Sequence, residues 1–145
     1  PKYYFNLKKA KEGVLGPNPD TPATPAVSII MAVAKATNML LEFGLDNVYK
    51  RQATYGKRVR EYVKSLGLEL LPEEDIASDL ITAIKVPEKY KASEIINHMK
   101  EKHGVLITGG QGPLKGKIIR IGHMGYVTEE MLTKTLEALK DAIKE

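Results

Sequence analysis

The segment Lys117-Ile118-Ile119-Arg120-Ile121-Gly122 decides the fold class, because its side chains alternate as those of a half-buried strand do. It belongs to a series of elements that begins at Leu68. Patterning predicts strands at 68–71 and 80–86, a helix at 93–102, strands at 105–108 and 117–122, and a helix at 128–143 capped by Thr128. This order is typical of an α+β module, so we expect a small, mostly antiparallel sheet with helices on one face.

Two long helices are predicted ahead of this module. Thr24-Pro25 is a typical helix start, since Thr caps helices and Pro suits the first helical position, and the helix extends from Ala26 to Phe43. It is apolar on nearly every face and must be buried on several sides. So short a chain favours cover by a second subunit or by a further domain. An amphipathic helix over 45–66 follows.

The chain of 145 residues is long enough for one domain plus an arm. We expect an N-terminal arm with a Pro-rich connector at 1–25, the two long helices at 26–66 and a small C-terminal domain at 67–145. The chain starts at Pro1 and not at Met, which is compatible with a fragment or a processed product.

Composition excludes several classes of protein. The net charge is +4, and 18 Lys against 4 Arg indicate a solvated surface and no nucleic-acid partner. The absence of Cys excludes disulfide scaffolds, thiolate zinc sites and Cys nucleophiles. No secretory signal or membrane span is visible, so we expect a cytoplasmic protein without a membrane partner.

Arg120 is the most informative candidate residue. Strand alternation places it on one face with Ile118 and Gly122, while Ile119 and Ile121 occupy the other face. An Arg among apolar and absent side chains needs a partner, and its planar fork suits bidentate binding of a carboxylate. The alternative is a salt bridge to an Asp or Glu of the same fold, and the spacing favours neither.

Two further segments are candidate binding elements. The run from Gly109 to Gly116 has features of a phosphate cradle and of a KH clamp loop, but it leads into a strand, so a flexible turn near a pocket is the better interpretation. Thr21 and Thr24 flank the start of the apolar helix, where hydroxyls and free N–H groups can bind a phosphate. Simple capping by Thr24 is the alternative.

The three histidines do not predict a metal site. His98 and His103 are five residues apart, so they do not share one helix face, and no thiolate can join them. His123 follows the Arg120 strand. No local signature of a Ser/His/Asp triad is present.

The whole chain resembles the C-terminal part of class V, fold-type I, pyridoxal-phosphate-dependent aminotransferases, the alanine–glyoxylate and serine–pyruvate group. The most specific match is Thr108-Gly109-Gly110-Gln111-Gly112 followed by the run from Gly116 to Gly125. Shorter matches are Tyr4-Phe5-Asn6-Leu7, the run from Thr21 to Ser28, Phe43-Gly44-Leu45-Asp46-Asn47 and Ser65-Leu66-Gly67-Leu68.

The resemblance implies roles for named residues. Arg120 matches the Arg that binds the α-carboxylate of the substrate, and Thr21 and Thr24 match hydroxyl residues that reach the cofactor phosphate of the other subunit in a homodimer. The lysine that forms the Schiff base, the Asp on the pyridine nitrogen and the stacking aromatic of the family lie upstream of this chain. We therefore expect no catalytic residue here and an inactive isolated chain.

The implied parent enzyme moves an amino group between a small amino acid, such as alanine, serine or aspartate, and glyoxylate or pyruvate. Two alternatives stay open at this point. One is a free-standing α+β module that binds small carboxylates through Arg120. The other is a relative of cysteine desulfurases or phosphoserine aminotransferases.

Overall fold

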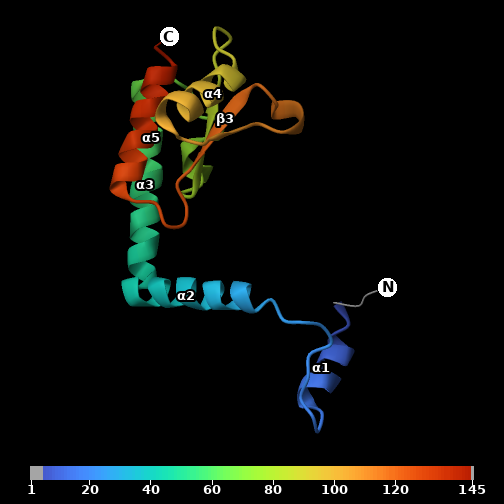
Figure 1. Ribbon diagram of the computed structural model, residues 1–145. Coiled ribbons are helices and arrows are strands. Elements are labelled where there is room, and N and C mark those ends of the chain that lie inside the picture. Colours follow the sequence, from blue (N-terminus) through green and yellow to red (C-terminus); the bar gives the residue numbers. More distant parts are fainter. Residues whose placement is uncertain (1–4, 145) are drawn as a thin grey trace. The chain divides into compact units, whose positions relative to one another are not determined.

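The structure is a computed structural model, and it describes residues 5–144 (Figure 1). The chain divides into two compact units, Pro1–Gly44 and Leu45–Glu145. The predicted division into an arm at 1–25, two long helices at 26–66 and a small domain at 67–145 stays a prediction.

The first unit begins with helix α1 (Leu7–Leu15). Its start is capped by Asn6, whose side-chain oxygen accepts a hydrogen bond from the backbone N–H of Lys9 at 3.1 Å. The Pro-rich connector folds back on this helix, because the N–H of Asp20 donates to the carbonyl of Gly13 at 3.0 Å. The sequence predicted an arm and no helix in this region, although Asn6 is a recognisable cap.

Helix α2 (Val27–Phe43) is the predicted apolar helix. It ends at Gly44, as predicted, and the N–H of Gly44 donates to the carbonyls of Leu40 and Leu41 at 3.0 and 3.2 Å. The φ of 86° at Gly44 lies in the region that favours glycine, so this residue closes the helix without strain.

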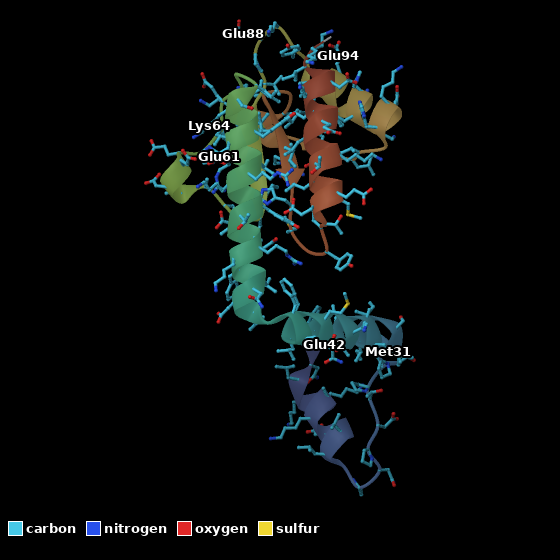
Figure 2. The ribbon with its side chains drawn as sticks, turned by 90° about the vertical axis from the view of Figure 1, so that its left-hand side faces the viewer. Met31, Glu42, Glu61, Lys64, Glu88 and Glu94 are labelled. Atoms are coloured by element: carbon cyan, nitrogen blue, oxygen red, sulfur yellow. The ribbon has the colours of Figure 1, made fainter. Side chains whose placement is uncertain are left out.

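No residue of α2 is buried. Figure 2 shows its side chains, including Met31, projecting from the helix. Nine large apolar side chains are between 39% and 67% exposed: Val27, Ile29, Ile30, Met31, Val33, Met39, Leu40, Leu41 and Phe43. No single helix in residues 5–144 is long and apolar enough to cross a membrane; α2 and α3 meet the criterion only as a bent pair broken at Gly44.

The second unit is the predicted α+β module. Its sheet is antiparallel, with strand order β1-β3-β2, so the last strand in sequence is the central one. The elements in chain order are α3 (Leu45–Ser65), the 3-10 turn η2 (Glu74–Ile76), β1 (Ile81–Lys85), α4 (Ala92–His103), β2 (Thr108–Gly109), the 3-10 turn η3 (Gly112–Leu114), β3 (Ile118–Gly122) and α5 (Glu129–Ala142).

The helices cover one face of the sheet, as predicted. Helices α3 and α4 pack against the strands, and α5 packs against both helices (Figure 1). The core between these layers contains Ile84, Ile119 and Ile121 from the sheet, together with Val59, Val63, Met99, Leu132, Leu136 and Leu139 from the helices. Figure 2 shows Glu61 and Lys64 on the side of α3 away from α5, as its amphipathic pattern predicts.

Two predicted strands are shorter than expected. The segment 68–71 forms only a bridge between Leu70 and Ile84, because the chain bends at Leu71 and Pro72 and leaves the sheet. The segment 105–108 contributes only Thr108 to a strand. Val105 is instead used to close α4, since its N–H donates to the carbonyl of Met99 at 3.0 Å beyond a left-handed Gly104.

Candidate substrate and cofactor site

Arg120 lies in the middle of the central strand. Its antiparallel partners are Ala83 on β1 and Thr108 on β2. Ile119 and Ile121, on the other face of the strand, are 1% exposed and form part of the core. The predicted alternation is therefore confirmed, and Arg120 stands on the sheet face that is opposite to the core helices.

The guanidinium of Arg120 is held by the backbone. Its Nε donates a hydrogen bond to the carbonyl of Gly109 at 3.0 Å, across the β2–β3 ladder. The side chain is half-buried. Within residues 5–144 no carboxylate forms an ion pair with Arg120, so the structure does not contain the intramolecular salt bridge that the sequence left open. The neighbouring residues Ala83 and Gly122 have small side chains or none.

The turn between β2 and β3 supports this arrangement. A Cβ built at Gly110 would lie 2.1 Å from the carbonyl oxygen of Leu114 and 2.8 Å from Ile118 Cγ1, so only glycine fits there without a backbone shift. Backbone hydrogen bonds hold the turn, among them those from the N–H of Leu114 to the carbonyl of Gln111 and from the N–H of Lys117 to the carbonyl of Leu114, at 3.1 and 3.0 Å. Gly110 of this turn thus lies close to the side chain of Ile118, which shares a face of β3 with Arg120.

Thr21 and Thr24 are exposed in the connector before α2. The capping role of Thr24 is wrong: Ala26 occupies the cap position, no side chain bonds the first turn, and the N–H of Val27 donates to the carbonyl of Pro25 at 2.8 Å. This tight turn separates Thr24 from the helix. The N–H of Thr21 donates to the carboxylate of Asp20 at 2.7 Å.

His98 and His103 lie close together, although their spacing predicted that they would not form a pair. Residues five apart differ by about 140° around a helix, but Asp141 of α5 lies between the two rings, and each Nε2 is 2.9 Å from its Oδ2. The ring centroids are 5.8 Å apart. The two hydrogen bonds lower the pKa of Asp141 below its ordinary value. The sequence could not indicate this cluster, because its third member is distant in the chain.

His123 is fully buried directly after β3. Its Nε2 lies 3.0 Å from the hydroxyl of Thr82, and its carbonyl accepts a hydrogen bond from Gln52 at 3.1 Å. Burial lowers the pKa of His123, and the positive charge of Arg60 lowers it further. The imidazole is therefore a neutral element of the core that supports the end of the Arg120 strand.

No protein-family model matches the chain. An uncharacterized aminotransferase of Methanocaldococcus jannaschii is 36% identical over 144 residues, which are 99% of this chain and 35% of the relative. The small subunit of a soluble hydrogenase from Synechococcus is 32% identical over the whole chain and 37% of its own length. The L-aspartate–glyoxylate aminotransferase of Paracoccus denitrificans is 32% identical over 90% of this chain and 33% of its own length. The chain matches the C-terminal part of class V aminotransferases.

Solved aminotransferase structures have the same fold. The alanine–glyoxylate aminotransferase of Nostoc superposes on 97% of the chain with a TM-score of 0.89 at 21% identity, and this chain covers 37% of it. The pyridoxamine–pyruvate aminotransferase of Mesorhizobium loti covers 86% of the chain with a TM-score of 0.81 at 31% identity, and 32% of that chain is matched. The chain thus spans about a third of the length of the aminotransferases that it matches.

Aminotransferase relatives imply pyridoxal phosphate as the cofactor of the family. A lysine that bonds this cofactor is activated by desolvation or by a neighbouring cation, whereas every lysine within residues 5–144 is solvent-exposed. The hydroxyls of Thr21 and Thr24 are exposed donors that fit a contact with its phosphate. The described residues therefore fit a supporting contribution to an aminotransferase cofactor site.

Proposed function

We propose that the chain is the C-terminal portion of a pyridoxal-phosphate-dependent aminotransferase. The whole enzyme would move an amino group between alanine, serine or aspartate and a 2-oxo acid, glyoxylate or pyruvate. The names of the aspartate–glyoxylate and serine–glyoxylate relatives support these substrate classes. These names also favour the alanine–glyoxylate group of aminotransferases over a relative of cysteine desulfurases or phosphoserine aminotransferases. The proposed protein is a cytoplasmic homodimer.

The placement of Arg120, bonded to the carbonyl of Gly109 and without an ion pair among residues 5–144, is the observation that supports the proposal. Every amino acid and every 2-oxo acid in this reaction class has one carboxylate next to the reacting carbon. The planar guanidinium can bind both oxygens of that carboxylate, and it stays charged at any working pH. Because Nε is already bonded to the carbonyl of Gly109, the two terminal nitrogens are held in a fixed direction before a substrate arrives.

The cofactor supplies the electron sink that labilises bonds at the substrate's α-carbon. This chain would contribute the hydroxyls of Thr21 and Thr24 to the phosphate of the cofactor in a second subunit. It would also contribute Arg120 for the substrate. The lysine that bonds the cofactor would come from residues outside this chain.

The test replaces Arg120 by Lys in the complete protein. Lys keeps the charge but loses the fork and the bond to Gly109, so we expect kcat/KM for alanine or serine to fall about ten- to a hundred-fold, as loss of one charged hydrogen bond implies. Cofactor absorbance should stay unchanged. Arg58→Lys is the matched control, because Arg58 pairs with Glu129 at the surface of α3 and α5.

A second variant separates cofactor from substrate. Thr21→Ala combined with Thr24→Ala should weaken retention of pyridoxal phosphate during dialysis, with the affinity for the 2-oxo acid changed less. An unchanged kcat/KM in Arg120→Lys would refute the carboxylate assignment. Tight binding of glyoxylate by the 145-residue chain without cofactor would instead favour the free-standing binding module.

A further inference from the structure

His98, His103 and Asp141 form a cluster that the proposed function does not use. The histidines belong to α4 and the aspartate to the last turn of α5, and the two helices pack side by side (Figure 1). Both Nε2 atoms lie 2.9 Å from the same Asp141 Oδ2. The three ligand atoms are all within 4.8 Å of one another. Three metal-ligating groups thus converge on one point.

The ligand set is one that Zn²⁺ prefers. Two imidazoles and one carboxylate are the protein ligands of many zinc sites, which leave a fourth position to water. Bonds of about 2.0–2.1 Å in a tetrahedron require ligand atoms roughly 3.4 Å apart. The present separations, from 2.9 Å to at most 4.8 Å, lie on both sides of this value, so small side-chain rotations would close the site.

Burial favours a preorganised but accessible site. The His98 side chain is 14% exposed and that of His103 is 28% exposed, so the helices limit their motion, whereas the Asp141 side chain is 54% exposed. An ion can therefore reach the cluster from solvent, and water can occupy the fourth position.

The helix termini add a favourable field. Helix α4 ends at His103 and α5 ends at Ala142, so the cluster lies at two carboxyl ends, where partial negative charge favours a cation. Lys100, Lys102 and Lys140 lie on the same turns and oppose a cation. All three are exposed, and water and salt screen exposed charges strongly.

We propose that His98, His103 and Asp141 form a surface site for one divalent transition-metal ion of the Zn²⁺ type. The two histidines do not share one face of α4, and Asp141 of α5 is the group on which they converge. The site needs no residue from another chain, so it is independent of the aminotransferase proposal.

The test is titration of the metal-free full chain with ZnCl₂ in an isothermal calorimeter. We expect one Zn²⁺ per chain, with binding at least ten-fold weaker in Asp141→Asn and in His103→Gln, because even an outer-shell partner of a metal ligand is worth that much. Glu130→Gln is the matched control. Glu130 is an exposed carboxylate on the same helix, roughly 16 Å along the axis from Asp141, and its variant should bind as the wild type does.

Circular dichroism of each variant shows whether it has folded. Co²⁺ gives a second readout, since its visible absorption reports a tetrahedral site and should disappear in Asp141→Asn. Zn²⁺ binding that is absent in the wild type, or equal in all three variants, would overturn the proposal. So would a lower unfolding midpoint in metal-free Asp141→Asn without any metal effect, because the cluster would then be a clamp between α4 and α5.

Discussion

Replacing Arg120 by Met in the 145-residue chain distinguishes a ligand-binding arginine from a structural one. Met is unbranched and of similar length, but it has no donor and no charge. The structure gives Arg120 one intramolecular partner among the described residues, the carbonyl of Gly109 at 3.0 Å. The variant therefore removes one hydrogen bond and no ion pair.

The magnitude follows from that contact. A typical intramolecular hydrogen bond contributes about 0.5–1.5 kcal/mol to stability. Breaking a buried ion pair costs far more, about 3–5 kcal/mol. With a urea m-value of about 1–3 kcal/mol/M, a loss of 1 kcal/mol moves the unfolding midpoint by roughly 0.3–1 M. We expect Arg120→Met to stay within this small shift.

The assay is urea unfolding followed by far-UV circular dichroism, with Arg60→Met as the matched control. Arg60 has an 11% exposed side chain, its two terminal nitrogens lie 3.2 Å from Asp79 Oδ1, and its Nη1 also donates to the carbonyl of Ser78 at 3.1 Å. Hydrogen bonds of charged groups are worth about 1.5–3 kcal/mol. Arg60→Met should therefore destabilise the chain clearly more than Arg120→Met.

A loss of stability in Arg120→Met equal to that in Arg60→Met would refute the reasoning. Arg120 would then have a structural pairing in solution, and its assignment to a substrate carboxylate would lose its support. An unchanged m-value is required for either conclusion, because a changed slope means that the denatured or native state itself has changed.

Three further predictions concern the chain alone. The pKa of buried His123 is lowered, so the unfolded state takes up a proton that the folded state excludes. The free energy of unfolding should therefore fall as pH drops below about 6.5, by at most about 1.4 kcal/mol per pH unit. His123→Gln should flatten this pH dependence in unfolding titrations. Gly110→Ala should cost about 1–3 kcal/mol, as overpacking does, whereas Gly122→Ala, whose Cβ would meet nothing closer than 3.9 Å, should change the unfolding midpoint little. The exposed apolar side chains of α2 predict self-association of the wild-type chain in sedimentation experiments, and Ile30→Glu should reduce it; a wild type that remains a monomer would contradict this expectation.

The sequence predicted the elements whose signals are local. Alternation in β3, the stop at Gly44 and the cap at Thr128 all depend on neighbouring residues, and the structure confirms them; the Thr128 hydroxyl accepts from the N–H of Met131 at 3.2 Å. The α+β order and the antiparallel sheet followed from the same signals. The short strands were overestimated, because their apolar side chains fit a strand while the backbone does not continue one. The first segment bends away from β1 at Leu71 and Pro72, and the N–H of Val105 closes α4.

The candidate functional residues also differ in whether their signal is local. Arg120 was identifiable because a charged residue within an apolar strand stands out in a segment of six residues. That it forms no ion pair with a carboxylate of residues 5–144 could be known only from the tertiary structure. The cluster of His98, His103 and Asp141 was not identifiable, since five-residue spacing disfavours a pair on one helix and only the packing of α4 against α5 brings the third group between them. Local patterns can therefore nominate a single side chain, whereas a site assembled across two helices requires the tertiary contact that creates it.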